Sequence, residues 1–229
     1  MLASLGLTTA LAGVNVAKHL LPGGDVWFSV AAAGALLAFA RQQGISWAQL
    51  GLGRDRLLSG ARWAAGVILV VAGAYLVGVL LPLTREAFLD PRYHQAVPKA
   101  LSTAFVVIPL GTVLLEEVAF RSVLWGMLSR HTTTRWVLLG SSALFGLWHI
   151  LPALSFASAH RGLEQAASHA GVAPTVAVVA GTVAFTALGG LVAGELRRRS
   201  GSLLASAGMH WATNALGVLF GVAAWRLAS

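Results

Sequence analysis

Seven runs of apolar residues follow one another along the chain, separated by short polar segments. A helix needs about 20 mostly apolar residues to cross a bilayer. We therefore predict an all-α, polytopic transmembrane helical bundle of about seven spans, within a range of six to eight. The candidate spans are Leu2–Leu21, Val26–Ala40, Trp63–Leu83, Ala100–Leu128, Trp136–Leu154, Pro174–Gly194 and Leu203–Trp225.

Composition supports a single integral-membrane domain over residues 1–229. Hydrophobic residues make up 57% of the chain and charged residues only 10%, against about 25% charged in soluble domains. The chain has no cysteine, which excludes disulfides, thiolate metal ligands and a cysteine nucleophile. The first run has no basic residue before it and no A-x-A-like site at its end, which indicates a first span and not a cleaved signal peptide.

Basic residues give the bundle a predicted orientation. The net charge of +8 is better explained by cytoplasmic loops than by a nucleic-acid partner, and we predict no nucleic-acid binding. Segments rich in arginine alternate along the chain with poorer ones, so that the richer set falls on one face. We predict a cytoplasmic N-terminus and an external C-terminus in what we expect to be a bacterial plasma membrane. The arginine-rich segments are Arg41–Arg62, Arg130–Arg135 and Arg197–Arg199. The polar stretch between Leu154 and Pro174 could hold a short surface helix.

Three charged residues, Glu116, Glu117 and Arg121, interrupt the fourth apolar run. A charge at the centre of a bilayer costs roughly 3 kcal/mol, so their presence points to chemistry. Residues four apart share one helix face, which pairs Arg121 with Glu117, whereas Glu116 lies about 140° from Arg121. Glu116 is therefore a candidate general base. The alternative is an ion pair that fixes helix packing, with Glu116 hydrogen-bonded to a neighbour.

Two histidines also lie within apolar runs, His149 in the fifth span and His210 in the seventh, and Asn214 follows His210 by four residues. His210 and Asn214 share one helix face. At 1.5 Å per residue, His149 lies about 20 Å and His210 about 13 Å from the cytoplasmic ends of their spans. These depths overlap with that of Glu116. We therefore predict one site, recessed between spans four, five and seven.

A carboxylate, two imidazoles and a carboxamide can activate water in two ways. In the first, Glu116 is the general base, assisted by His149, while His210 and Asn214 donate to the developing oxyanion. In the second, Glu116, His149 and His210 hold a zinc ion that leaves one position for water. No G-x-S-x-G or H-E-x-x-H motif occurs in the chain. The residues alone leave both arrangements open.

The three motifs E-E-x-x-x-R, F-x-x-x-H and H-x-x-x-N, in this order, resemble those of the CAAX prenyl endopeptidase and bacteriocin-processing (CPBP, or Abi) intramembrane proteases. The resemblance covers a protease core at residues 100–219, and residues 1–99 carry no motif. It implies an endopeptidase that opens towards the cytoplasm and acts on a protein or peptide, whose C-terminal tail could be lipidated. It assigns the base to Glu116, its partners to Glu117 and Arg121, and the remaining catalytic groups to His149, His210 and Asn214. Family members are described both as zinc enzymes and as metal-free ones.

Two other functions fit intramembrane glutamate and histidine residues. The first is a proton- or cation-coupled transporter, because such residues also mark ion pathways. The chain lacks the inverted repeat and the paired broken helices that many transporters have. The second is a non-catalytic binding or immunity protein, which would be free to lose the motifs that this chain keeps.

Overall fold

The computed structural model describes residues 2–20, 25–159 and 174–228, and within these ranges the chain is helical and forms no strand. The short surface helix expected before Pro174 falls largely on residues 160–173, outside the described residues. The α-helices are α1 (Leu2–Leu20), α2 (Asp25–Gln42), α3 (Leu57–Leu80), α4 (Pro82–Arg85), α5 (Val97–Ser102), α6 (Leu114–Glu117), α7 (Trp125–Leu128), α8 (Thr134–Trp148), α9 (Ile150–Ala159), α11 (Pro174–Ser200), α12 (Leu203–Trp211) and α13 (Gly217–Ala228). The 3-10 turns are η1 (Arg54–Arg56), η2 (Glu86–Phe88) and η3 (Pro91–Tyr93), and the π-helical segments are η4 (Thr103–Val107), η5 (Pro109–Val113), η6 (Val118–Leu124) and η7 (Ala212–Leu216).

Four helices of the described residues are long and apolar enough to cross a membrane. These four helices coincide with the predicted third to sixth spans, and the second is a shorter apolar helix, Val26–Gln42. The first and seventh predicted spans are also helical, in α1 and in α12–η7–α13, but they do not belong to the four. An all-helical bundle is therefore established, while a count of seven spans stays a prediction. The four helices are Arg54–Leu80, Val97–Leu128, Thr134–Ser155 and Thr175–Ser200.

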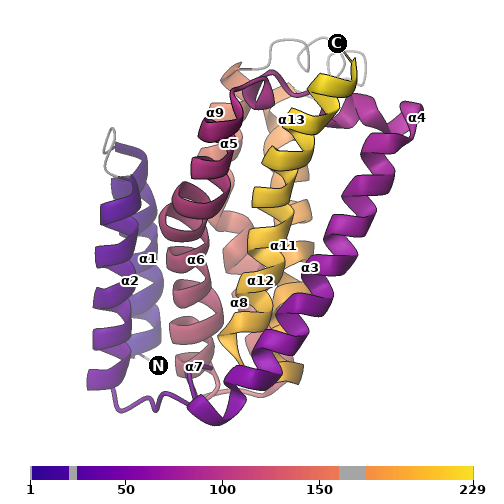
Figure 1. Cartoon of the computed structure of the whole chain (residues 1–229). Coiled ribbons are helices and arrows are strands. Elements are labelled where there is room, and N and C mark those ends of the chain that lie inside the picture. The colour runs from indigo at the N-terminus through magenta and orange to yellow at the C-terminus, as the bar shows by residue number, and fades with distance from the viewer. Residues whose placement is uncertain (1, 21–24, 160–173, 229) are drawn as a thin grey trace.

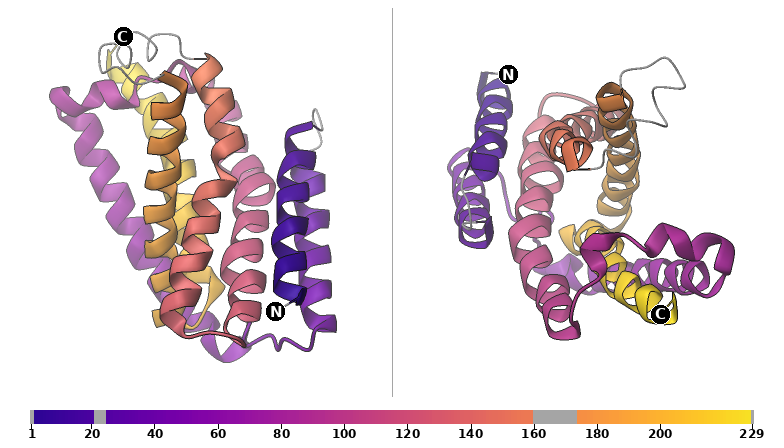
Figure 2. Two further views of the ribbon diagram at one scale, coloured as in Figure 1. Left: turned by 180° about the vertical axis from the view of Figure 1, so that it is seen from behind. Right: turned by 90° about the horizontal axis from the view of Figure 1, so that it is seen from above.

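The helices run up and down one bundle, with the N-terminus and the C-terminus at opposite ends (Figure 1). The α1–α2 pair lies on one side of α6, and α3 lies on the other side against α12 and α13 (Figure 2). The connections after α2, α7 and α11 gather at the N-terminal end (Figure 1). The three arginine-rich segments lie in these connections or in the helix turns next to them, so they gather at one end of the bundle. Which face is cytoplasmic stays a prediction.

The helix that carries the first motif is not a regular α-helix, because η4, η5 and η6 interrupt it. Pro109 supplies one cause, since it has no N–H to bond the preceding turn. π-Helical turns occur often at functional sites, and their freed carbonyls need donors when no water is available. Here a side chain from another helix bonds a carbonyl in every one of the four π segments. The bonds are Trp211 Nε1 to Ala104 O (2.9 Å), Lys18 Nζ and Ser29 Oγ to Gly111 O (2.7 Å each), Ser141 Oγ to Phe120 O (3.0 Å), Arg197 Nε to Arg121 O (3.2 Å) and Tyr75 OH to Thr213 O (3.0 Å).

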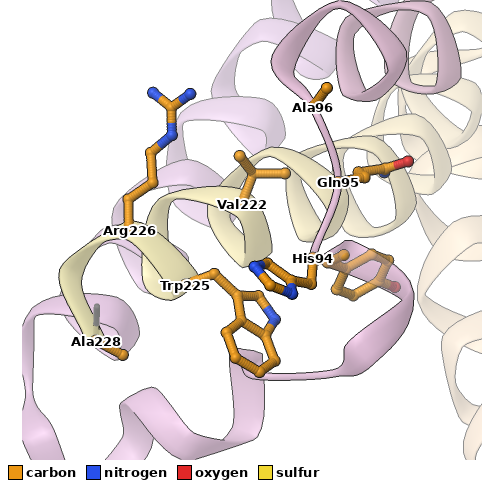
Figure 3. Close-up of a pocket in the computed structure, with 8 residues that line it drawn as sticks. His94, Gln95, Ala96, Val222, Trp225, Arg226 and Ala228 are labelled. Atoms are coloured by element: carbon orange, nitrogen blue, oxygen red, sulfur yellow. The ribbon is translucent and has the colours of Figure 1, made fainter.

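At the C-terminal end, a cavity of about 490 Å³ lies between α13 and the segment that follows η3 (Figure 3). The His94 ring stacks on Trp225 at 4.5 Å between centroids, and Trp225 Nε1 donates to Asp90 O at 3.1 Å. These contacts hold α13 against the loop. The residues that line this cavity include none of the six candidate site residues.

Candidate active site

Glu117 and Arg121 form the ion pair that their spacing predicts. Arg121 Nη1 lies 3.2 Å from Glu117 Oε1, and each residue is 1% exposed. The guanidinium carbon also lies 3.9 Å from the centre of the Phe145 ring, close enough for a cation–π contact. The pair is formed across α6 and η6, so the π-helical turn does not separate the two side chains. One carboxylate of the motif is thus neutralised within its own helix.

The second carboxylate, Glu116, is buried, and its two oxygens differ in their hydrogen bonding. Oε1 accepts a hydrogen bond from Trp148 Nε1 at 3.1 Å. Oε2 is buried and has no hydrogen-bond partner among the described residues. Glu117 Oε2 is likewise buried without a hydrogen-bond partner among the described residues, so the lack of a partner does not by itself distinguish Glu116. The Glu116 Oε2 atom differs in that two histidine Nε2 atoms face it, which makes it the candidate reactive atom.

His149 and His210 both direct Nε2 towards this free oxygen. The distances to Glu116 Oε2 are 3.9 Å from His149 Nε2 and 3.7 Å from His210 Nε2, which are too long for direct hydrogen bonds. The other ring nitrogens are occupied: His149 Nδ1 lies 2.8 Å from Phe145 O, and His210 Nδ1 lies 3.0 Å from Glu117 Oε1. Because both of these partners only accept, each Nδ1 carries a proton. In a neutral ring Nε2 is then an acceptor.

Phe145, the first residue of the F-x-x-x-H motif, lies at the centre of the site. Its ring makes edge contacts with His149 and His210 at centroid distances of 4.7 and 5.9 Å, besides its contact with Arg121. The ring therefore contacts the ion pair and both histidines. His149 is the more exposed of the two histidines, with 18% of its side chain accessible against 10% for His210.

The comparison with known families agrees with this geometry. The model of the type II CAAX prenyl endopeptidase Rce1-like family matches residues 98–216, just over half of the chain, and includes all three motifs. The chain belongs to this family. No curated protein and no solved structure matches the chain. Family membership points to a protease, and the long apolar helices place this Rce1-like protein in a membrane.

Five of the six predicted site residues of this Rce1-like protein come together, and no contact recorded for the described residues connects Asn214 to them. Asn214 lies in η7 and is exposed. Its role as an oxyanion donor therefore stays a prediction.

In the arrangement seen, the predicted zinc ligands stand somewhat farther apart than the ligands of a tetrahedral zinc ion. No group of three or more His, Cys, Asp or Glu side chains among the described residues could hold a metal ion. Glu116 Oε2 is 3.7 and 3.9 Å from the two Nε2 atoms, whereas ligands about 2.0–2.1 Å from a tetrahedral zinc stand roughly 3.3 Å apart. Zinc binding by Glu116, His149 and His210 stays a prediction, which composition analysis can test.

Sequence reasoning missed Trp148, the donor to Glu116 Oε1. The residue lies directly before His149 and is 5% exposed. A tryptophan in an apolar run usually packs against its neighbours or anchors the helix at the membrane interface, so the residue type did not indicate a role in the site. A signal was nevertheless present four residues later, because Pro152 frees the Trp148 carbonyl and breaks the helix there.

Proposed function

We propose that this Rce1-like protein is an intramembrane endopeptidase in which Glu116 activates a water molecule for attack on a peptide bond. The observation that carries the proposal is the Glu116 Oε2 atom, which is buried, unpaired and faced by two imidazoles. A water molecule there would lie within hydrogen-bond reach of Oε2 and of either Nε2. The bond from Trp148 occupies Oε1, so the proton of the attacking water would go to Oε2.

The proposed reaction needs one proton carrier. Glu116 takes a proton from water as the oxygen attacks the carbonyl carbon, and the carbonyl oxygen becomes an oxyanion. Glu116 then gives the proton to the amide nitrogen, the C–N bond breaks, and a carboxylic acid and an amine leave. An oxyanion donor is worth about 3 kcal/mol in comparable sites. Asn214 would be one donor. His210 would be another when both of its ring nitrogens carry a proton, and the Glu117 carboxylate beside the ring would then balance its positive charge.

We further propose that the substrate is a protein with a prenylated CAAX-type C-terminal tail, and that the site opens towards the cytoplasm. Family membership supports the substrate class. The gathering of arginine-rich segments at one end of the bundle supports the orientation.

The test is cleavage of a farnesylated CAAX peptide by the purified protein in liposomes. Glu116→Gln keeps the shape of the side chain and its contact with Trp148 but removes the base. We expect its kcat to fall about 100-fold or more, the usual contribution of general-base catalysis. Glu86→Gln, an exposed glutamate in η2, is the matched control and should keep wild-type activity. Wild-type turnover by Glu116→Gln would refute the proposal.

The metal question needs a separate measurement on the same protein. Elemental analysis of purified wild-type protein and of the His149→Ala and His210→Ala variants measures bound zinc directly. The water mechanism without metal predicts less than one zinc per ten chains in all three. A stoichiometric zinc that both substitutions remove would instead establish the second arrangement.

A further inference from the structure

The active site receives a contact from α1, a helix outside the region that matches the family. Asn15 lies in α1 and is buried, and its Nδ2 donates to the backbone carbonyl of Trp148 at 2.8 Å. The family match begins only at residue 98. Asn15 therefore connects the α1–α2 pair, called the N-terminal hairpin below, to the site. It does so through Trp148, the residue that bonds Glu116.

The carbonyl that Asn15 bonds is free because of Pro152. In a continuous helix the N–H of residue 152 would bond the carbonyl of residue 148, but proline has no N–H and its ring pushes that carbonyl aside. Accordingly, α8 ends at Trp148 and α9 begins at Ile150, with His149 at the break between them. The backbone N–H of His149 bonds Gly146 O, and its Nδ1 bonds Phe145 O. Asn15 satisfies the carbonyl that this break exposes.

Packing and hydrogen bonds both hold Trp148, which is 5% exposed and belongs to the hydrophobic core. Its ring makes a T-shaped contact with the Phe120 ring at a centroid distance of 5.4 Å. A cavity of about 220 Å³, lined by both Asn15 and Trp148, lies beside it. On this side two hydrogen bonds hold the residue, one from Asn15 to the backbone carbonyl and one from the indole Nε1 to Glu116.

We propose that Asn15 is a positioning residue of the active site. It holds the helix break at Trp148, and through this break it holds the indole against Glu116 Oε1 and the His149 ring opposite Glu116 Oε2. The inference rests on the proposed function for its effect on turnover, but the contact chain that it describes is independent of any activity.

The test compares Asn15→Leu with Gln42→Leu, which removes an exposed carboxamide from the same hairpin. We expect kcat of Asn15→Leu to fall about 10- to 100-fold with KM within about twofold, because small displacements of reacting groups have effects of this size. Gln42→Leu should match wild type. Wild-type kcat in a folded Asn15→Leu protein would overturn the proposal.

A double-mutant cycle with Trp148→Phe distinguishes positioning from a general loss of stability. If Asn15 acts through Trp148, the loss in Asn15→Leu/Trp148→Phe will be smaller than the product of the two single losses. Losses that multiply would show that Asn15 acts elsewhere and would overturn the proposal.

The Trp148 indole N–H resonance, assigned by its absence in Trp148→Phe, gives a readout without catalysis. We expect it to move in Asn15→Leu and to stay in place in Gln42→Leu. If wild type cleaves no peptide but the resonance moves, the proposed function fails while the positioning contact holds. If the resonance stays in place in Asn15→Leu, the positioning proposal fails whatever the activity. Should Asn15→Leu not fold, Asn15→Ala replaces it in the same comparison.

Discussion

Removal of one partner of the Glu117–Arg121 pair tests whether the site holds a true buried ion pair. Both residues are 1% exposed, so neither charge can be solvated by water if the other is lost. Breaking a buried pair by removing one partner costs about 3–5 kcal/mol, whereas replacing both partners with apolar residues is often neutral. For a chain of this length the loss corresponds to roughly 6–20 °C in Tm.

The structure also predicts the order of the two single variants. In Arg121→Met, Glu117 keeps the bond from His210 Nδ1 at 3.0 Å, so part of its charge is still compensated. In Glu117→Met, the guanidinium keeps the Phe145 ring and the more distant charge of Glu116, and His210 loses its acceptor as well. We therefore expect Glu117→Met to lower Tm more than Arg121→Met.

The double variant separates stability from activity. Glu117→Met/Arg121→Met should recover to within about 1.5 kcal/mol of wild type, since the cost that remains is the loss of Glu117 as a partner of His210 and Ser206. Its kcat should nevertheless stay at least about 10-fold low, because the His210 ring has lost the carboxylate that orients it. Thermal unfolding in detergent and the peptide-cleavage assay measure the two effects. A double variant as unstable as the sum of the single variants would contradict this account.

Two further substitutions test how α11 supports the site. In Gly146→Ala, the new Cβ would stand 2.7 Å from Val183 O, so α8 and α11 must separate, and we expect about 1–3 kcal/mol lower stability by thermal unfolding. An unchanged Tm would show that the two helices are not in close contact there. Arg197→Met removes two bonds, from Nε to Arg121 O and from Nη2 to Gln49 O at 2.9 Å, and should destabilise the protein by about 3 kcal/mol in chemical unfolding. A loss below about 0.5 kcal/mol would refute the view that Arg197 supports the π-helical turn at Arg121.

The parts of the site that sequence could predict depend on local spacing. The i,i+4 separation of Glu117 and Arg121 is enough to pair them, and it leaves Glu116 free on the same helix. The positions of His149 and His210 within apolar runs marked them as buried polar groups, and both indeed face Glu116. Such predictions succeed because they need only the geometry of one helix and the cost of a polar group in lipid.

The parts that could not be predicted depend on partners far along the chain. The carbonyl of Phe120, in the π-helical turn, is bonded by Ser141, which lies 21 residues away along the chain. The bond from Asn15 to the Trp148 carbonyl spans 133 residues, and no local pattern marks it. For Asn214, its spacing from His210 suggested a shared site; the side chain is exposed, and its role in that site stays a prediction.

The two oxygens of Glu116 suggest how a hydrolytic centre can be kept ready inside a protein that must satisfy its own polar groups. In a bilayer every buried donor and acceptor needs a partner from the protein, and the four π-helical segments obtain theirs from neighbouring helices. Glu116 follows this rule at Oε1 and departs from it at Oε2. The bond to Oε1 keeps the carboxylate from turning away from the histidines, while Oε2 can take a proton without losing a hydrogen bond. With one oxygen fixed and one free, Glu116 is both held in place and able to take a proton. Replacing Trp148 with a residue that cannot donate a hydrogen bond should therefore reduce kcat and change KM less.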